Sequence, residues 1–170
     1  MKAISARASR GLNIGAIMVA ADNSGAKVVK LVSVKHGKST KGRQQYAKIA
    51  DWVKVSVRKG VPEMKGKVFD AVLIRQKKSY RRLNGERIAF EDNAVALLKD
   101  EKGNPKGTQI KGPVPRELSE KWKEVAKISA IVVWEKIFQP NGKQADKQES
   151  KESSDIMLHF TLEKKWFLLI

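Results

Sequence analysis

The chain has 170 residues, of which 41% are hydrophobic, and its 35 Lys and Arg against 18 Asp and Glu give a formal net charge of +17. This length suits one hydrophobic core with an appendage, and such an excess of cations favours nucleic acid or an anionic membrane surface as partner. The absence of cysteine excludes disulfide frameworks and thiolate metal sites and is compatible with a reducing cytosol.

The positive charge is unevenly distributed. Residues 1–133 contain 29 Lys and Arg against 12 Asp and Glu, whereas residues 134–170 contain 6 of each, so the whole excess lies in the first part. No apolar run approaches the roughly 20 residues that a membrane-spanning helix needs. Gly15 interrupts the N-terminal apolar run, which favours a first strand over a secretion signal. We therefore expect a cytosolic protein without a membrane span.

Short segments rich in Val and Ile predict a mainly β body. Residues 16–21 and 27–35 flank the turn sequence DNSG and form a candidate hairpin. In 51–60, valines alternate with polar and cationic residues, which is typical of a strand with one buried face. Further strands are predicted at 68–75, 86–90 and 94–98, the first apolar on both faces toward its end. Five or six short strands favour a closed barrel.

The segment after the strands changes character. Residues 99–112 predict a protruding hairpin or loop with its turn at 103–105. Leu118, Trp122 and Val125 then follow at helical spacing and predict one short amphipathic helix, on which Glu117 and Lys121 have a favourable i, i+4 order. Two prolines precede this helix, and 127–133 closes the domain as an extended segment or helical turn.

We expect a domain boundary near residue 133. Residues 139–155 are polar and balanced in charge, so they predict a linker, and 156–170 are apolar again. The apolar end is compatible with a docked strand or helix and with a poorly ordered terminus.

The sequence offers little for catalysis. His36 and His159 lie in different parts of the chain and have no metal-ligand spacing, so we expect no metal or cofactor. Ser24 lies in a turn sequence rather than a hydrolase elbow. The GKSTKGR segment lacks the first glycine of a phosphate-binding loop, because Val32 occupies that position. An enzyme is therefore the weakest hypothesis.

Basic stretches occur at 36–48, 75–82 and 99–111. A single basic stretch is equally well explained as a solvated surface loop, but three stretches of the same sign favour phosphate binding. Tyr80, in the second stretch, could stack on a base or sugar. RNA or DNA binding is therefore the leading interpretation. A free OB-like translation or single-strand-binding factor shares this basic barrel and remains an alternative.

Four successive motifs resemble the universal large-subunit ribosomal protein family fourteen: VAADNSGAK, KGRQQYAKIADWVKVSVRKG, VFDAVLIRQKKSYRRLNGERIAFEDNAVALL and GNPKGTQIKGPVPREL. They cover about residues 12 to 133, and RQKKSYRRLNG and FEDNA resemble the archaeal and eukaryotic branch. The resemblance implies a five-stranded β-barrel (an OB/SH3-like small barrel) with a projecting basic hairpin and short C-terminal helices. It also implies a structural role in the large subunit.

The resemblance implies that basic side chains bind large-subunit rRNA. The expected RNA-binding residues are Lys27, Lys38, Lys41, Arg43, Lys48, Arg58, Arg75, Lys77, Lys78, Tyr80, Arg81, Arg82, Lys106 and Lys111. Asn84 and Gly85 would form the turn that returns the chain to the barrel.

The C-terminal helix is implied to face the small subunit. The expected partners are small-subunit rRNA at an intersubunit bridge, large-subunit ribosomal proteins three and twenty-four-e, and the anti-association factor, initiation factor six. The residues expected at this interface are Arg116, Glu117, Lys121 and Lys123. Residues 134–170 have no counterpart in the family, so they are either a lineage-specific extension that packs on a ribosomal neighbour or an addition without a role.

Overall fold

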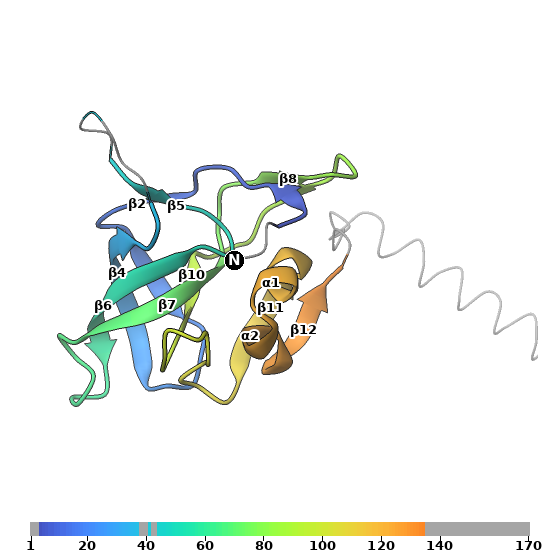
Figure 1. Cartoon of the computed structure of the whole chain (residues 1–170). Helices are drawn as coiled ribbons and strands as arrows, with labels where there is room; N and C mark the ends of the chain where they lie inside the picture. Colours follow the sequence, from blue (N-terminus) through green and yellow to red (C-terminus); the bar gives the residue numbers. More distant parts are fainter. Residues whose placement is uncertain (1–3, 38–40, 42–43, 135–170) are drawn as a thin grey trace, which may run out of the picture. The chain divides into compact units, whose positions relative to one another are not determined.

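The computed structural model describes residues 4–37, 41 and 44–134, and its centre is a closed five-stranded barrel (Figure 1). The strands follow the order β10-β3-β4-β6-β7 around the barrel, and all neighbouring pairs are antiparallel except β10 with β3. The predicted barrel is thus confirmed. Its strands are β3 (Ile17–Ala20), β4 (Ala26–Val34), β6 (Trp52–Gly60), β7 (Val68–Arg75) and β10 (Ala94–Leu97).

Two hydrophobic cores lie on opposite faces of β7 and β10. Successive side chains of a strand point to opposite faces, so Ala71 and Leu73 fill the barrel interior while Val72 and Ile74 face outward. The outward pair packs against Leu118 and other residues of the C-terminal helices. Because both faces are covered, the end of β7 is buried throughout, as its apolar sequence predicts.

The predicted helix is present as two short helices, α1 (Arg116–Lys121) and α2 (Lys123–Lys127). Trp122 separates them with φ −123° and ψ 74°, outside the helical region. Its indole Nε1–H donates to the carbonyl of Ala50 at 3.0 Å, and its ring packs edge-on against Trp52 at 5.8 Å between centroids. The interruption thus falls at a buried side chain, and Leu118, Trp122 and Val125 are buried as the predicted apolar face requires.

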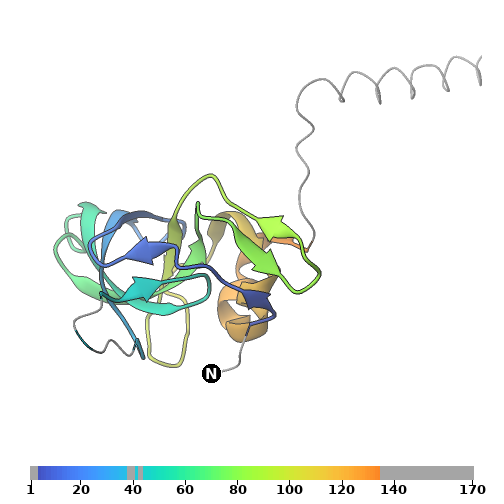
Figure 2. The same ribbon diagram turned by 90° about the horizontal axis from the view of Figure 1, so that it is seen from above.

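Small two- and three-stranded sheets surround the barrel and were for the most part not predicted. The hairpin β8–β9 extends away from the barrel in Figure 1, and Figure 2 shows β1 beside it. The strands of these sheets are β1 (Ala6–Arg7), β2 (Leu12–Asn13), β5 (Tyr46–Ala47), β8 (Tyr80–Arg82), β9 (Arg87–Ile88), β11 (Ile110–Pro115) and β12 (Ser129–Val133).

The loop after β10 does not protrude as expected but folds back on the body. The backbone N–H of Lys106 donates to the carbonyl of Leu97 at 2.8 Å. Gly103 is buried with φ +94°, and a Cβ at this position would lie 2.7 Å from the ring of Trp122. Only glycine combines this backbone conformation with so close an approach. The loop thereby packs against the interruption between α1 and α2.

Among the described residues, no helix is long and apolar enough to cross a membrane. The predicted linker, the apolar C-terminal end and the predicted RNA-binding residues Lys38 and Arg43 lie outside the described ranges. The domain boundary near residue 133 stays a prediction.

Candidate nucleic-acid interface

Three arginines form a row across the outer face of the β1–β8–β9 sheet. Strand pairing places Arg7 opposite Arg81 and Arg81 opposite Arg87, and all three residues are exposed. Directly opposed side chains on antiparallel strands have Cβ atoms about 5 Å apart, a distance at which like charges repel each other. Within the described part of the chain, none of the three pairs with an acidic side chain. This arginine row is therefore a concentrated, uncompensated positive charge.

The strand period explains why this row is exposed. In β8, Arg81 points outward while Tyr80 and Arg82 on either side of it are buried. The turn after β8 contains Gly85 with φ +92°, which suits a tight hairpin return. The resulting register brings Arg87 of β9 directly beside Arg81.

Further exposed cations extend the arginine row. The hydroxyl of Ser9 donates to the carbonyl of Ser79 at 2.7 Å, and the buried amide of Gln76 donates to the Ser9 hydroxyl at 3.1 Å. These bonds hold the segment after β1 alongside the segment that joins β7 to β8. The row and the exposed cations of these two segments are called the basic face below; its members are Arg7, Arg10, Lys77, Lys78, Arg81 and Arg87.

An exposed aromatic ring lies at one end of the basic face. The guanidinium carbon of Arg10 lies 4.5 Å from the ring centroid of Tyr46, which is 37% exposed. Arginine planes and aromatic rings are the surfaces on which unpaired bases stack in RNA-binding proteins. Tyr46 and Arg10 therefore add a stacking platform to the cations, and Lys41 nearby along the chain is exposed as well.

The structure corrects the expectation for Tyr80 and Arg82. Both are 2% exposed, and they surround Glu117 of α1, which is fully buried. Arg82 donates to both carboxylate oxygens of Glu117, and the Tyr80 hydroxyl donates to one of them at 2.9 Å. Arg82 also donates to the carbonyls of Val133 and Trp134. With four of its five N–H donors used internally, Arg82 is a structural residue rather than a phosphate contact.

The buried environment changes the pKa of the Tyr80 hydroxyl. Burial, together with the negative charge of Glu117, raises the pKa of Tyr80 well above its usual range. Tyr80 therefore stays a neutral hydrogen-bond donor and has no exposed ring for base stacking. We expected Glu117 at the surface, paired with Lys121. It is instead buried against Tyr80 and Arg82 of β8, so the predicted Glu117–Lys121 pair is not formed.

Arg75 is likewise turned inward, at 7% exposed. It forms a two-pronged pair with Asp92, with nitrogen to oxygen distances of 2.6 and 2.8 Å, and it donates to the carbonyls of Lys111 and Pro113. It thereby ties the end of β7 to β11. The hydrogen bond from Arg75 holds the pKa of Asp92 below its ordinary value of 3.8.

This shift predicts an acid dependence of stability. A carboxyl group whose pKa is lower in the folded than in the unfolded state stabilises the fold when it is ionised. For Asp92 this contribution is present above the ordinary pKa of 3.8 and is lost as the pH falls through the pKa of the folded state. We expect the difference in unfolding free energy between the unaltered chain and Asp92→Asn to be constant from about pH 5 to 7 and to shrink below about pH 4. Urea unfolding at each pH measures this difference. A difference that persists unchanged at pH 3 would contradict the assignment.

The remaining predicted RNA contacts lie on other elements. Lys106 is exposed, and its ammonium lies 4.3 Å from the ring centroid of Phe69. Lys48 is half-buried, and its backbone N–H donates to Asp51. The others of this group, all exposed on barrel strands or on β11, are Lys27, Arg58 and Lys111.

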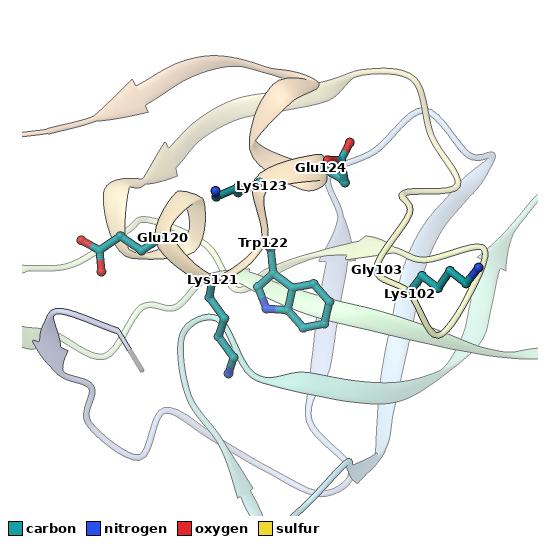
Figure 3. A pocket seen from close by; sticks show the side chains of 7 residues that line it. All are labelled: Lys102, Gly103, Glu120, Lys121, Trp122, Lys123 and Glu124. Atoms are coloured by element: carbon teal, nitrogen blue, oxygen red, sulfur yellow. The ribbon is translucent and has the colours of Figure 1, made fainter. Parts of the chain in front are cut away.

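Two residues of the predicted partner interface, Lys121 and Lys123, line a pocket of about 310 Å³ beside Trp122 (Figure 3). Lys123 is exposed at this pocket, whereas Lys121 is half-buried and lies 3.8 Å from a carboxylate oxygen of Asp51. Burial lowers the pKa of Lys121 and raises that of Asp51. Arg116 is half-buried and faces Glu120 at 3.7 Å. The pocket carries charges of both signs, and no group of three metal-ligating side chains was found among the described residues.

Sequence reasoning missed four residues of this site. Arg7, Arg10 and Tyr46 are isolated among neutral residues in the sequence, and only strand pairing brings them to the basic face. For Arg87 a signal existed, because Arg81 and Arg87 each lie three residues from Asn84 in the turn sequence LNGE.

Comparison with known proteins shows which family this chain resembles. Residues 11–133 match the model of the family described as ribosomal protein L14p/L23e. The large ribosomal subunit protein uL14 of Nanoarchaeum equitans is 57% identical over 133 residues, which are 78% of this chain and all of that protein. The uL14 proteins of Methanothrix thermoacetophila and Halorubrum lacusprofundi are 48% and 44% identical over the same shares. The chain therefore belongs to the ribosomal protein L14p/L23e family, in its archaeal branch.

Proposed function

We propose that the chain binds large-subunit rRNA through the basic face and presents its C-terminal helices to the small subunit. As a member of a family of ribosomal proteins, it is a structural, non-enzymatic constituent of the large subunit in the cytoplasmic ribosome. The proposal that the basic face contacts rRNA is supported by the arginine row.

The observation that carries the proposal is the placement of Arg7, Arg81 and Arg87 on neighbouring strands, where none of them forms an ion pair with an acid among the residues that the structure describes. A guanidinium presents a planar set of donors that matches phosphate oxygens, and close phosphates along an RNA backbone would remove the repulsion within the row. Such contacts position the protein on RNA and are largely independent of base sequence. The Arg10–Tyr46 stack provides a surface for an unpaired base.

The C-terminal helices support the second part of the proposal. Lys123 is exposed, and Lys121 and Arg116 lie at the same helices with partial exposure. We propose that this surface contacts small-subunit rRNA and the anti-association factor, initiation factor six, with large-subunit ribosomal proteins three and twenty-four-e as neighbours. The buried Glu117 would act there only by holding α1 in place.

Sedimentation tests the function with the full chain. A tagged copy produced in an archaeal host is expected to sediment with the large subunit and to remain there after a wash in moderate salt, because multiple phosphate contacts are hard to release together. Arg7→Glu with Arg81→Glu should deplete the chain from large subunits, whereas Lys65→Glu with Lys67→Glu, exposed cations outside the basic face, should not. Release of the unaltered chain by the wash would favour the free OB-like factor instead.

A further inference from the structure

The outer face of β3 and β4 carries exposed aliphatic side chains that the rRNA contacts do not use. Ile17 is 68% exposed, Val19 46% and Val32 43%, and Val28 is half-buried. Single exposed apolar residues are ordinary, but a contiguous patch marks an interaction surface. Strand pairing makes this patch contiguous, because Val19 lies opposite Val28 and Ile17 lies opposite Lys30, two residues before Val32. These four aliphatic residues are called the apolar patch below.

Lys30 occupies the middle of the apolar patch. Ile17 lies opposite it on β3, and Ser56 lies opposite it on β6. A Cβ at Gly15 would lie 3.8 Å from Lys30 Cε, so the aliphatic stem is flanked by backbone as well. Lys30 is half-buried, and it forms no ion pair with an acidic side chain in the ranges that the structure describes. A lysine in this setting lays its stem along apolar surface and presents one unneutralised ammonium.

We propose that the apolar patch is the docking surface of a protein neighbour that presents a carboxylate surrounded by aliphatic side chains. The neighbour would be another protein of the large subunit, so the inference rests on the proposed function. The carboxylate would pair with Lys30, and the aliphatic side chains would cover Ile17, Val19 and Val32. Such an arrangement, an apolar centre with a single desolvated charge pair, is common at protein interfaces.

RNA fits this surface poorly. Lys30 is the one cation at the centre of the patch, and Lys27 and Lys59 lie only at its Val28 end. The patch has no aromatic side chain, whereas RNA is held by several phosphate contacts and by stacking. A second copy of the chain fits poorly as well. A two-fold interface brings the same patch from both copies together, and because the patch contains no carboxylate, each Lys30 would be covered without a counter-charge.

Photo-crosslinking tests the proposal within assembled large subunits. A full-length tagged chain with p-benzoylphenylalanine in place of Ile17 is expected to form an adduct that survives ribonuclease and is destroyed by protease. The same photoreactive residue in place of Arg81 is the matched control and should form adducts with RNA. Lys30→Glu should lower the yield of the Ile17 adduct several-fold, while Lys30→Arg should preserve it, because the positive charge is retained.

Three outcomes would overturn the proposal: no adduct at position 17, an adduct only with RNA, or an adduct with a second copy of the chain. A yield that is unchanged in Lys30→Glu would overturn the role of the carboxylate. Failure of the proposed function is distinguishable, because the unaltered chain would then be missing from large subunits before any irradiation.

Discussion

Replacing Glu117 with alanine is expected to lower the free energy of unfolding by about 3–5 kcal/mol, because the guanidinium of Arg82 would remain buried without its counter-charge. The loss also removes the acceptor of the Tyr80 hydroxyl. The pair is enclosed by β8, α1 and the end of β12, so water has little access to replace the missing carboxylate. Urea unfolding followed by circular dichroism measures the change.

Two further variants separate the buried charge from simple packing. Arg82→Met combined with Glu117→Leu should be considerably less destabilised than Glu117→Ala, because it removes both charges together. Tyr80→Phe should lose only about 1 kcal/mol, since it removes one hydrogen bond and leaves the ion pair intact. If Glu117→Ala unfolds within about 1 kcal/mol of the unaltered chain, the pair does not have the assigned importance.

Removing the arginine row is expected to weaken RNA binding and to flatten its salt dependence. Each lost phosphate contact removes roughly 0.7 to 0.9 from the slope of log affinity against log salt, so Arg7→Ala, Arg81→Ala and Arg87→Ala together should remove about 2 to 3. The row is exposed and makes no internal ion pairs with described residues, so unfolding stability should be unchanged or slightly higher. Titration of an archaeal large-subunit rRNA fragment at several salt concentrations measures the slope.

A control with equal charge loss tests whether position matters. Lys59→Ala, Lys65→Ala and Lys67→Ala also remove three exposed cations, but from β6 and the turn that follows it. This triple variant should retain most of the affinity and most of the slope. Equal slopes in the two triple variants would mean that net charge alone governs binding and that the basic face has no special role.

The barrel strands could be predicted from the sequence because β3, β4 and β6 each have a buried and a wet face, while β10 and the end of β7 are uninterrupted apolar runs. In β6, valine alternates with lysine, serine and arginine, and the structure buries the valines as expected. The two-residue strands β1, β2 and β5 left no such signal, since their pairing depends on partners far along the chain. The C-terminal helix was located correctly, but its interruption at Trp122, whose indole donates to the distant carbonyl of Ala50, has no signal in the local sequence.

The dependence on distant partners also explains why some RNA-binding residues predicted within RQKKSYRRLNGERIAF are wrong. The sequence predicts phosphate contacts throughout this stretch, yet Arg81 faces outward while Arg75 and Arg82 are buried. A run of cations does not reveal which of them alternate toward the interior. The acids that neutralise the buried ones, Asp92 and Glu117, are also too far along the chain to be assigned by spacing.

By itself, the sequence was sufficient for the family and the mainly β barrel, and it predicts a polyanion-binding surface, because these follow from composition, strand period and motif order. Only the tertiary structure decided which cations form that surface. Strand register placed Arg7, Arg81 and Arg87 side by side and turned Arg82 onto Glu117. Each choice depends on a pairing between distant segments, and a charge is stable inside the fold only where such a pairing supplies its partner.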